Sequence, residues 1–143
     1  MSNTKQEKYT EFTTLLFAIT SRLSKKADTV LGNSLGINFN TYKVLQIIQA
    51  AEYNQNDIAQ VLNISSAALS KIVKSLRSKK LVSQQKKINN SIFLQISERG
   101  KQLLSEANTL LTREFPHDLA EIFSEQELDI LVERLYSMVD HLD

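Results

Sequence analysis

Residues 54–76 have the sequence NQNDIAQVLNISSAALSKIVKSL, and this stretch decides the fold. Apolar residues recur at steps of three and four over about 55–62 and again over about 66–79, which predicts two short amphipathic helices. Asn63 stands between them, and asparagine tolerates the positive φ of a tight turn. The stretch therefore predicts two helices joined by a very short turn.

Both helices also have the expected start signals. Asn54 precedes the first helix and Ser65 precedes the second, and these short polar side chains can accept a hydrogen bond from a free amide of the first helical turn. Asp57 adds a negative charge to the first turn of the first helix, where it suits the positive end of the helix dipole. We therefore expect N-caps at both positions.

The spacing of apolar residues changes directly after the second helix. Residues 81–86 (LVSQQK) and 91–96 (SIFLQI) predict two short strands, the second with alternating apolar side chains. The polar residues 87–90 would join them as a hairpin loop. A helix, a turn, a second helix and a two-stranded hairpin together define a winged helix-turn-helix, whose second helix is shaped to enter the major groove of DNA.

Helical periodicity continues on both sides of this segment. We expect a long helix over about 8–31, ended by Gly32, Asn33, Ser34 and Gly36. A helix over about 39–51 follows it. Downstream, Ser97 and Glu98 open a helix that runs to about Phe115, with Pro116 near its end.

The last helix has the clearest start in the sequence. Ser124 and Glu127 fit a capping box, in which each residue bonds to the backbone amide of the other. An apolar stripe then continues to the C-terminus at Leu128, Leu131, Val132, Leu135, Met138, Val139 and Leu142. We interpret this stripe as a dimer interface, and packing on the preceding helix of the same chain is the alternative.

The predicted fold is mainly α with a small β-hairpin wing. We expect residues 1–143 to form a single protomer, in which residues 36–100 are a winged helix-turn-helix lobe. Residues 8–31 and 101–143 would form a helical dimerisation region beside it. Only 3 glycines and 1 proline are present, which favours long helices over a turn-rich β fold.

Charge is distributed unevenly along the chain, although the net charge is only +1. Residues 54–101 carry nine lysines and arginines against two acids, whereas residues 102–143 carry two against ten. A basic segment of this kind favours binding to a polyanion such as nucleic acid. A solvated surface whose charges cluster by chance is the alternative.

Short and basic side chains share one side of the second helix of the motif. A helix that enters the major groove must present small or polar residues to the base edges and cations to the phosphates. The polar loop of the hairpin would lie along the minor groove or its flanking phosphates. The candidate DNA-binding residues are Asn54, Gln55, Ser65, Ser66, Ala67, Ser70, Lys71, Lys74, Ser75, Arg77, Lys86, Lys87, Asn89 and Asn90. A solvated polar surface is the alternative for each of them.

Residues 54–76, followed by ISERGK at 96–101, resemble the multiple antibiotic resistance regulator (MarR) family. The helical flanks extend the resemblance over nearly the whole chain. It implies a homodimer in which the first helix and the last two interlock, so that two recognition helices reach successive major grooves of a pseudo-palindromic operator. It also implies a small-molecule or stress signal that alters the distance between the two DNA-binding lobes.

Three positions depart from the pattern of that family. Family wings commonly carry Asp-x-Arg, whose arginine enters the minor groove, and the corresponding residues here are Ile88 and Asn90. We expect the asparagines of the loop to form hydrogen bonds there and its lysines to hold phosphates. Lys80 stands where the family often has a glycine, just after the recognition helix.

Four aromatic residues are candidates for the wall of an effector cavity. They are Phe17, Phe39, Tyr42 and Phe115. Such a cavity would lie between the helical body and the DNA-binding lobe, where aromatic side chains could bind an apolar small molecule. Packing in the core is the alternative, because aromatic residues at helical spacing are common there.

Several kinds of chemistry have no support in the sequence. The absence of cysteine excludes disulfides, thiolate metal sites and a cysteine redox switch. His117 and His141 have Asp118 and Asp140 beside them, so a zinc or other metal site is the alternative, but two distant histidines without a ligand-spaced cluster are more often surface residues, and we expect no metal or cofactor. A glycine-rich phosphate loop and a nucleophile elbow are also missing, so we expect no enzyme activity.

The N-terminal residues 1–14 are polar, without the apolar core of a signal peptide. No stretch approaches the roughly 18 apolar residues that span a bilayer. We therefore expect a cytoplasmic protein with no membrane partner.

Together these patterns predict a sequence-specific regulator of transcription. Its partners would be double-stranded DNA, a second copy of the chain and a small-molecule effector, and repression is the expected mode of action. The alternative is an adaptor that uses the winged helix to bind protein and not DNA. The near-neutral net charge and the missing wing arginine favour that alternative, and the basic bias of residues 54–101 opposes it.

Overall fold

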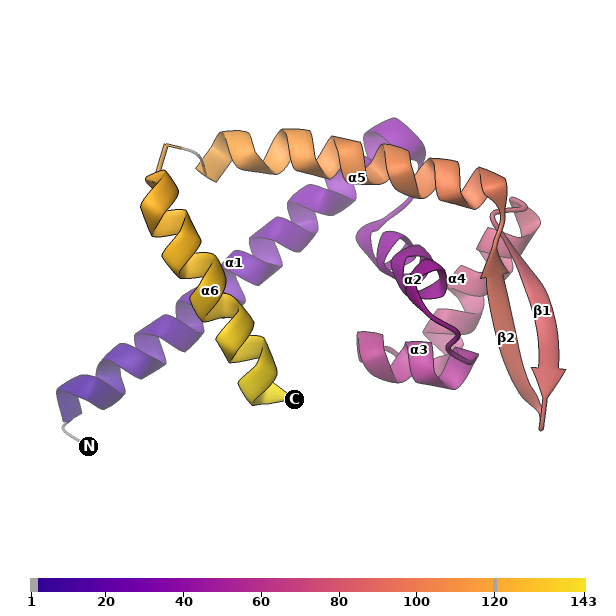
Figure 1. The fold of residues 1–143 in the computed structure, drawn as a ribbon, viewed down its shortest axis with the longest axis horizontal. Coiled ribbons are helices and arrows are strands. Elements are labelled where there is room, and N and C mark those ends of the chain that lie inside the picture. Colours follow the sequence, from indigo (N-terminus) through magenta and orange to yellow (C-terminus); the bar gives the residue numbers. More distant parts are fainter. Residues whose placement is uncertain (1–2, 120) are drawn as a thin grey trace. The chain divides into compact units, whose positions relative to one another are not determined.

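The computed structural model describes residues 3–119 and 121–143, and it leaves aside the side chains of residues 86, 87 and 116–118. The elements run in the order α1 (Asn3–Leu35), α2 (Phe39–Ala50), α3 (Gln55–Leu62), α4 (Ser66–Ser78), β1 (Val82–Ile88), β2 (Ser91–Ile96), α5 (Glu98–Leu119) and α6 (Glu125–Leu142) (Figure 1). The predicted fold class, mainly α with a small β-hairpin wing, is confirmed. The chain divides into two compact units, residues 1–108 and 109–143, which are described separately.

The helix-turn-helix forms as predicted from its local signals. The Asn54 side-chain oxygen accepts a hydrogen bond from the Asp57 amide at 2.8 Å, and the Ser65 hydroxyl accepts one from the Ala68 amide at 3.0 Å. Between the helices, Asn63 has a left-handed conformation with φ 53°. These three short polar residues therefore fix where α3 begins, where it ends and where α4 begins.

The core of the first unit is built mainly from aliphatic side chains and is shared by every element of the winged segment. Its largest fully buried side chains are Leu31, Val44, Leu45, Ile58, Leu69, Leu76 and Leu104. Among the described residues, no charged side chain is buried, and the Tyr42 hydroxyl is the polar group that this core contains. Burial of each leucine or isoleucine contributes about 1.5–3 kcal/mol, so this core holds α3 and α4 at a fixed angle.

The wing is a two-stranded antiparallel sheet with a tighter tip than the sequence indicated. The four-residue loop predicted for 87–90 is wrong, because β1 continues to Ile88 and pairs there with Ser91. Asn89 and Asn90 alone make the turn, both with positive φ, of 49° and 65°. A two-residue turn of this kind matches the twist of paired strands and favours asparagine.

Two contacts anchor the wing to the helices. The backbone of Asn54 forms a bridge to Phe93 of β2, so the start of α3 lies beside the sheet. At the other end, the Ser97 hydroxyl lies 2.7 Å from the Lys80 carbonyl oxygen and 3.0 Å from that of Leu81, and it accepts a hydrogen bond from the Gly100 amide at 3.0 Å. Ser97 thus caps α5 and ties its start to the α4–β1 turn.

The limits of two helices differ from the predictions. The first helix was expected over 8–31, but α1 runs from Asn3 to Leu35. Gly32, Asn33 and Ser34 stay helical, and the helix ends only at Gly36, whose φ is +67°. The helix expected to stop near Phe115 continues to Leu119. None of the described helices is long and apolar enough to cross a membrane.

The end of α4 has a residue in an unfavourable conformation. The amide of Leu81 donates to the Leu76 carbonyl at 2.9 Å and the amide of Lys80 donates to the Arg77 carbonyl at 3.0 Å, which is the Schellman pattern. The residue at the left-handed position of this motif is usually glycine, but here it is Lys80, with φ 60°. A side chain with a Cβ costs about 1–2 kcal/mol in this region.

Lys80→Gly should therefore stabilise the protein. Relief of the left-handed strain outweighs the added freedom of glycine in the unfolded chain, so we expect a gain of about 1 kcal/mol in the free energy of unfolding, measured by urea denaturation. Lys79→Gly is the matched control, because Lys79 has φ −83° and gains nothing from glycine. A Lys80→Gly protein less stable than wild type would contradict the strain argument.

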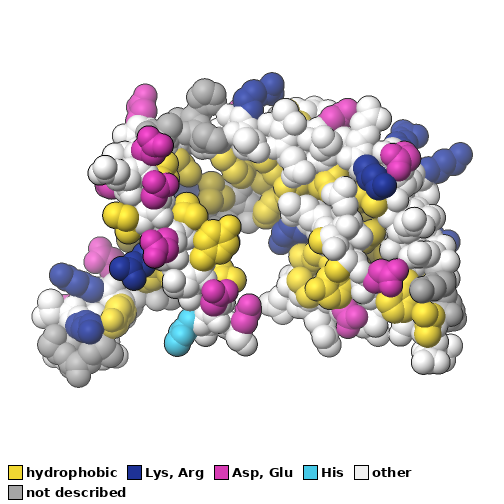
Figure 2. Space-filling model, viewed as in Figure 1, with side chains coloured by type: hydrophobic (Ala, Val, Ile, Leu, Met, Phe, Trp, Pro, Cys, Tyr) yellow, Lys and Arg dark blue, Asp and Glu magenta, His cyan; other side chains and the backbone are white. Residues whose placement is uncertain are grey.

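The second unit contains the end of α5 and the whole of α6. The predicted capping box is confirmed: the Glu127 amide donates to the Ser124 hydroxyl, and the Ser124 amide donates to the Glu127 carboxylate, both at 3.2 Å. No residue of α6 is buried. Figure 2 shows hydrophobic side chains exposed among acidic ones over this helix. The most exposed apolar residues of α6 are Ile130, Val132, Tyr136, Val139 and Leu142.

Candidate nucleic-acid interface

The two sides of α4 have opposite roles. Leu69, Val73 and Leu76 are buried and fix the helix to the core. The other side is open to solvent, and it carries seven of the predicted DNA-binding residues, all exposed: Ser66, Ala67, Ser70, Lys71, Lys74, Ser75 and Arg77. We call these seven residues the recognition face. Its small side chains at the start of α4 and its cations further along match what a major groove and its phosphates require.

The cations of the recognition face have no acidic partner in the described part of the chain. Within the described residues, the ion pairs are formed elsewhere, on α5, between Lys101 and Glu98 and between Arg113 and Glu114. Lys74 and Arg77 border a hollow beside α4 that Gln55, Ser70, Val73 and Ser78 complete. The positive charge of these side chains is therefore available to phosphate oxygens without first breaking an ion pair.

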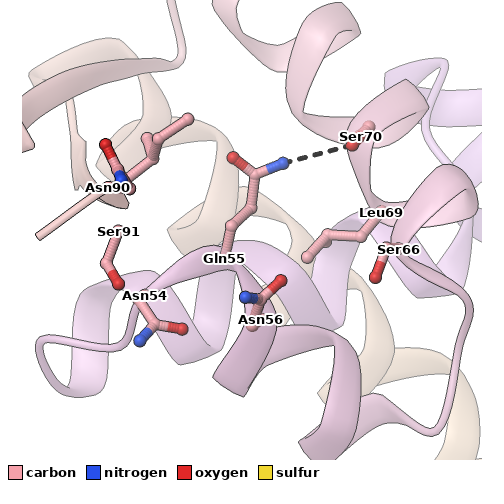
Figure 3. A pocket seen from close by; sticks show the side chains of 9 residues that line it. Asn54, Gln55, Asn56, Ser66, Leu69, Ser70, Asn90 and Ser91 are labelled. Atoms are coloured by element: carbon pink, nitrogen blue, oxygen red, sulfur yellow. Dashed lines mark hydrogen bonds between the residues drawn. The ribbon is translucent and has the colours of Figure 1, made fainter.

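A second hollow, of about 160 Å³, lies at the start of the recognition face. It brings together three segments that are separate in the sequence: the start of α3, the first turns of α4 and the tip of the wing (Figure 3). Its lining residues are Asn54, Gln55, Asn56, Ser66, Leu69, Ser70, Asn90, Ser91 and Ile92. Most of them carry an amide or hydroxyl, which can donate a hydrogen bond to a phosphate oxygen or a base edge.

Some of these polar side chains are already committed to the fold. The side-chain oxygens of Asn54 and Ser65 accept the N-cap hydrogen bonds, whereas the side-chain NH2 group of Asn54 and the hydroxyl proton of Ser65 can still donate to a ligand. Gln55 reaches from α3 to α4, where its Nε2 donates to the Ser70 hydroxyl at 3.4 Å (Figure 3). That distance is at the long limit for a hydrogen bond, so the contact is weak.

The predicted wing contacts are placed only in part. Asn89 and Asn90 are exposed at the tip of the hairpin, and Asn90 lines the same hollow as Gln55. The side chains of Lys86 and Lys87 lie outside the described residues. The structure therefore brings one predicted wing residue next to the recognition face and leaves the predicted phosphate contacts of the lysines as predictions.

Sequence reasoning missed two polar residues of this hollow. Asn56 and Ser91 line it together with the predicted residues. Asn56 follows Gln55 at the start of α3, and Ser91 follows the turn of the wing. Both positions could have been suggested by their neighbours, but only the folded chain shows that the start of α3 faces the tip of the wing.

The four aromatic residues proposed for an effector cavity are in different surroundings. Phe39 and Tyr42 stack with their ring centroids 5.8 Å apart. Phe17 is 73% exposed on α1, in a shallow hollow with Tyr9 and three threonines. Phe115 belongs to the second unit and is half-buried. An effector site formed by these residues remains a prediction.

Tyr42 belongs to a polar network between α2 and α5 within the first unit. Its hydroxyl donates to the Asn108 side-chain oxygen at 2.6 Å and accepts from Gln46 at 2.8 Å. Burial raises the pKa of the Tyr42 phenol, and the Gln46 hydrogen bond opposes that rise in part. The phenol is therefore neutral at physiological pH and remains a donor to Asn108.

No metal site is evident in the described part of the chain. Groups of three or more His, Cys, Asp or Glu residues that could hold an ion do not occur there. His141 lies on α6, whereas the side chain of His117 is outside the described residues.

The segment that contains the recognition face matches a known protein family. Residues 40–83 match the family described as Winged helix-turn-helix DNA-binding. The match runs from α2 to the start of β1, so it contains the whole of α3 and the recognition face. No curated protein matches the sequence. The chain therefore contains a winged helix-turn-helix domain, and the wider architecture is compared through solved structures.

Solved structures extend the likeness beyond the winged segment. A MarR family protein from Bacillus stearothermophilus has a TM-score of 0.80 and 17% identity, and the match covers 96% of both chains. Wild-type MarR from E. coli has a TM-score of 0.77 and 19% identity over 87% of this chain and 93% of that one. The chain has the MarR fold.

A third solved structure matches nearly the whole of both chains. The transcriptional regulator BldR from Sulfolobus solfataricus has a TM-score of 0.78 and 18% identity, and covers 96% of this chain and 99% of its own. Because these matches cover most of both chains, the MarR fold here includes helices outside the winged segment. The sequence identities are low, so the likeness concerns architecture.

Proposed function

We propose that this chain is a MarR-family transcription regulator that binds duplex DNA sequence-specifically through α4. The observation that carries the proposal is the recognition face, which is exposed and basic and has no acidic partner among the residues that the structure describes. It lies inside the segment that matches a winged helix-turn-helix DNA-binding family. The small residues at its start allow the helix to approach base edges, while Lys71 and Lys74 can reach phosphates or bases.

The active form in this proposal is a homodimer on a pseudo-palindromic operator. The exposed apolar stripe of α6 supports it, because apolar side chains that share one exposed face of a helix often mark a protein–protein interface. Residues 36–100 would be the DNA-binding lobe of each protomer, and the helices on either side would form the dimerisation region. Two recognition faces related by a two-fold axis would enter grooves about 34 Å apart.

Repression is the proposed mode of action. A dimer bound at a promoter competes with RNA polymerase for the same DNA, and a small-molecule or stress signal ends the competition by misaligning the two lobes. Only a ligand with different affinities for the DNA-binding arrangement of the lobes and for the misaligned one can do this. MepR, with 22% identity, is described as a transcription regulator of a multidrug efflux pump of Staphylococcus aureus, which fits a role in responding to small molecules.

Selection of binding sites from random duplexes tests the proposal as a whole. The full chain should enrich a two-fold-symmetric site, because operator symmetry mirrors the symmetry of the protein. Its affinity should fall steeply as salt rises, since phosphate contacts release counterions. A chain that binds no duplex in a salt-sensitive manner at micromolar concentration would instead support the protein-binding adaptor.

Loss of one recognition-face lysine should weaken operator binding. With Lys71→Ala or Lys74→Ala we expect affinity to fall about tenfold, and the slope of log affinity against log salt to decrease by about 2, one phosphate contact per protomer. Fluorescence anisotropy over a salt series measures both. Lys25→Ala, at an exposed lysine of α1, is the control and should leave the slope unchanged. Unchanged binding by both recognition-face variants would contradict the assignment.

A further inference from the structure

The recognition face has few side chains able to distinguish one base pair from another. On α4 itself, serine hydroxyls bond to several bases without strong preference, and a lysine offers a single rotating ammonium group. A strong preference usually needs two simultaneous hydrogen bonds from one planar group, such as a carboxamide or guanidinium. In α4, only Arg77 has such a group, and it lies in the last turn.

Gln55 supplies a carboxamide to this face from a neighbouring helix. It is the first residue of α3, and its side chain extends to Ser70 in the middle of α4 (Figure 3). It lines both hollows of the surface, the one toward the wing tip and the one beside Lys74 and Arg77. Gln55 thus occupies the centre of the surface although it does not belong to the recognition helix.

The surroundings of Gln55 leave its carboxamide available for a ligand. Its one hydrogen bond, to Ser70, is 3.4 Å long and lies at an exposed position, so water or a base can replace it at small cost. The adjacent Asn54 is different, because its oxygen is fixed as the N-cap of α3. The hollows on either side give the Gln55 side chain room to turn away from Ser70.

We propose that Gln55 reads an adenine of each operator half-site in the major groove. Its Nε2 would donate to adenine N7, and its Oε1 would accept from the adenine N6 amino group, which is the bidentate pairing that a carboxamide makes. The Ser70 hydroxyl, released from Gln55, would then be free for a neighbouring phosphate or base. This inference rests on the proposed function. It adds that a residue of α3, outside the recognition helix, determines which base is preferred at one operator position.

Site selection with wild type and Gln55→Ala tests the inference. Wild type should prefer A·T over G·C at one position of each half-site by about 5- to 150-fold, and Gln55→Ala should lose that preference while it keeps the other positions. Gln60→Ala, at an exposed glutamine near the other end of the same helix, should select the wild-type site. A Gln55→Ala protein that still selects the same adenine would overturn the inference.

Two further variants separate a direct contact from an effect through Ser70. Gln55→Arg should change the preferred pair at that position from A·T to G·C, because a guanidinium pairs with guanine O6 and N7. Ser70→Ala should keep the adenine preference, because the carboxamide of Gln55 stays in place, even though loss of the Ser70 hydroxyl lowers the overall affinity. The direct contact would be overturned if Ser70→Ala lost the preference for adenine and Gln55→Arg did not change the preferred base pair. A wild-type chain that selects no site would instead overturn the proposed function.

Discussion

Gly100→Ala should lower the free energy of unfolding by about 3–5 kcal/mol, the largest loss of stability that we expect from a single methyl group in this chain. A Cβ at this position would lie 2.2 Å from the Leu81 carbonyl oxygen and 2.7 Å from the side chain of Ile96. The Leu81 oxygen is held in place because it also accepts from the Ser97 amide at 2.9 Å, and the Ile96 side chain is buried in the core. The backbone of α5 must therefore move away from the wing, which breaks the Ser97 cap.

The other two glycines of the chain provide controls for this prediction. Gly32 lies within α1, and its nearest contact for a Cβ is 3.9 Å away, so Gly32→Ala should stabilise by up to about 1 kcal/mol through helix propensity. Gly36 has open space around it but a φ of +67°, so Gly36→Ala should cost about 1–2 kcal/mol. Thermal melts followed by circular dichroism would rank the three variants, and a Gly100→Ala protein as stable as Gly36→Ala would contradict the argument.

The helix-turn-helix could be predicted from sequence because its signals are local. Asn54, Asn63 and Ser65 act on amides and dihedral angles within a few residues of themselves, so their roles do not depend on the rest of the fold. The apolar spacing of α4 likewise fixed which side faces the core. These local signals therefore also predicted the exposure of the recognition face.

The features that sequence reasoning missed depend on residues far apart in the chain. The need for glycine at position 100 arises from Leu81, and the hollow at Gln55 requires the tip of the wing to meet the start of α3. The end of α1 was misplaced for a related reason: Gly32 and Gly36 are both possible helix ends by composition, and only packing decides that Gly36 takes the positive φ. Lys80 could be recognised as unusual in sequence, but its strain is visible only in the structure.

Charges on the apolar stripe of α6 should disrupt both the dimer and tight operator binding. Val132 and Val139 are 48% and 57% exposed in the protomer, so aspartates at both positions do not disturb its core. If a second copy covers the stripe, each aspartate becomes a buried charge without a partner, which costs several kcal/mol. We therefore expect the Val132→Asp, Val139→Asp protein to be a monomer at micromolar concentration by light scattering.

Loss of the dimer should also lower the operator affinity of the Val132→Asp, Val139→Asp protein by about 100-fold or more. Each half-site then binds alone, and the second binding event no longer benefits from the high effective concentration that the linked lobe provides. The Ile130→Asp, Ser137→Asp protein is the matched control. It adds the same charge to the same helix. Ile130 is 59% exposed, but it lies on the opposite side of the helix from Val139. The control should remain a dimer, and equal loss of dimer in both proteins would show that added charge on α6, and not its apolar stripe, decides assembly.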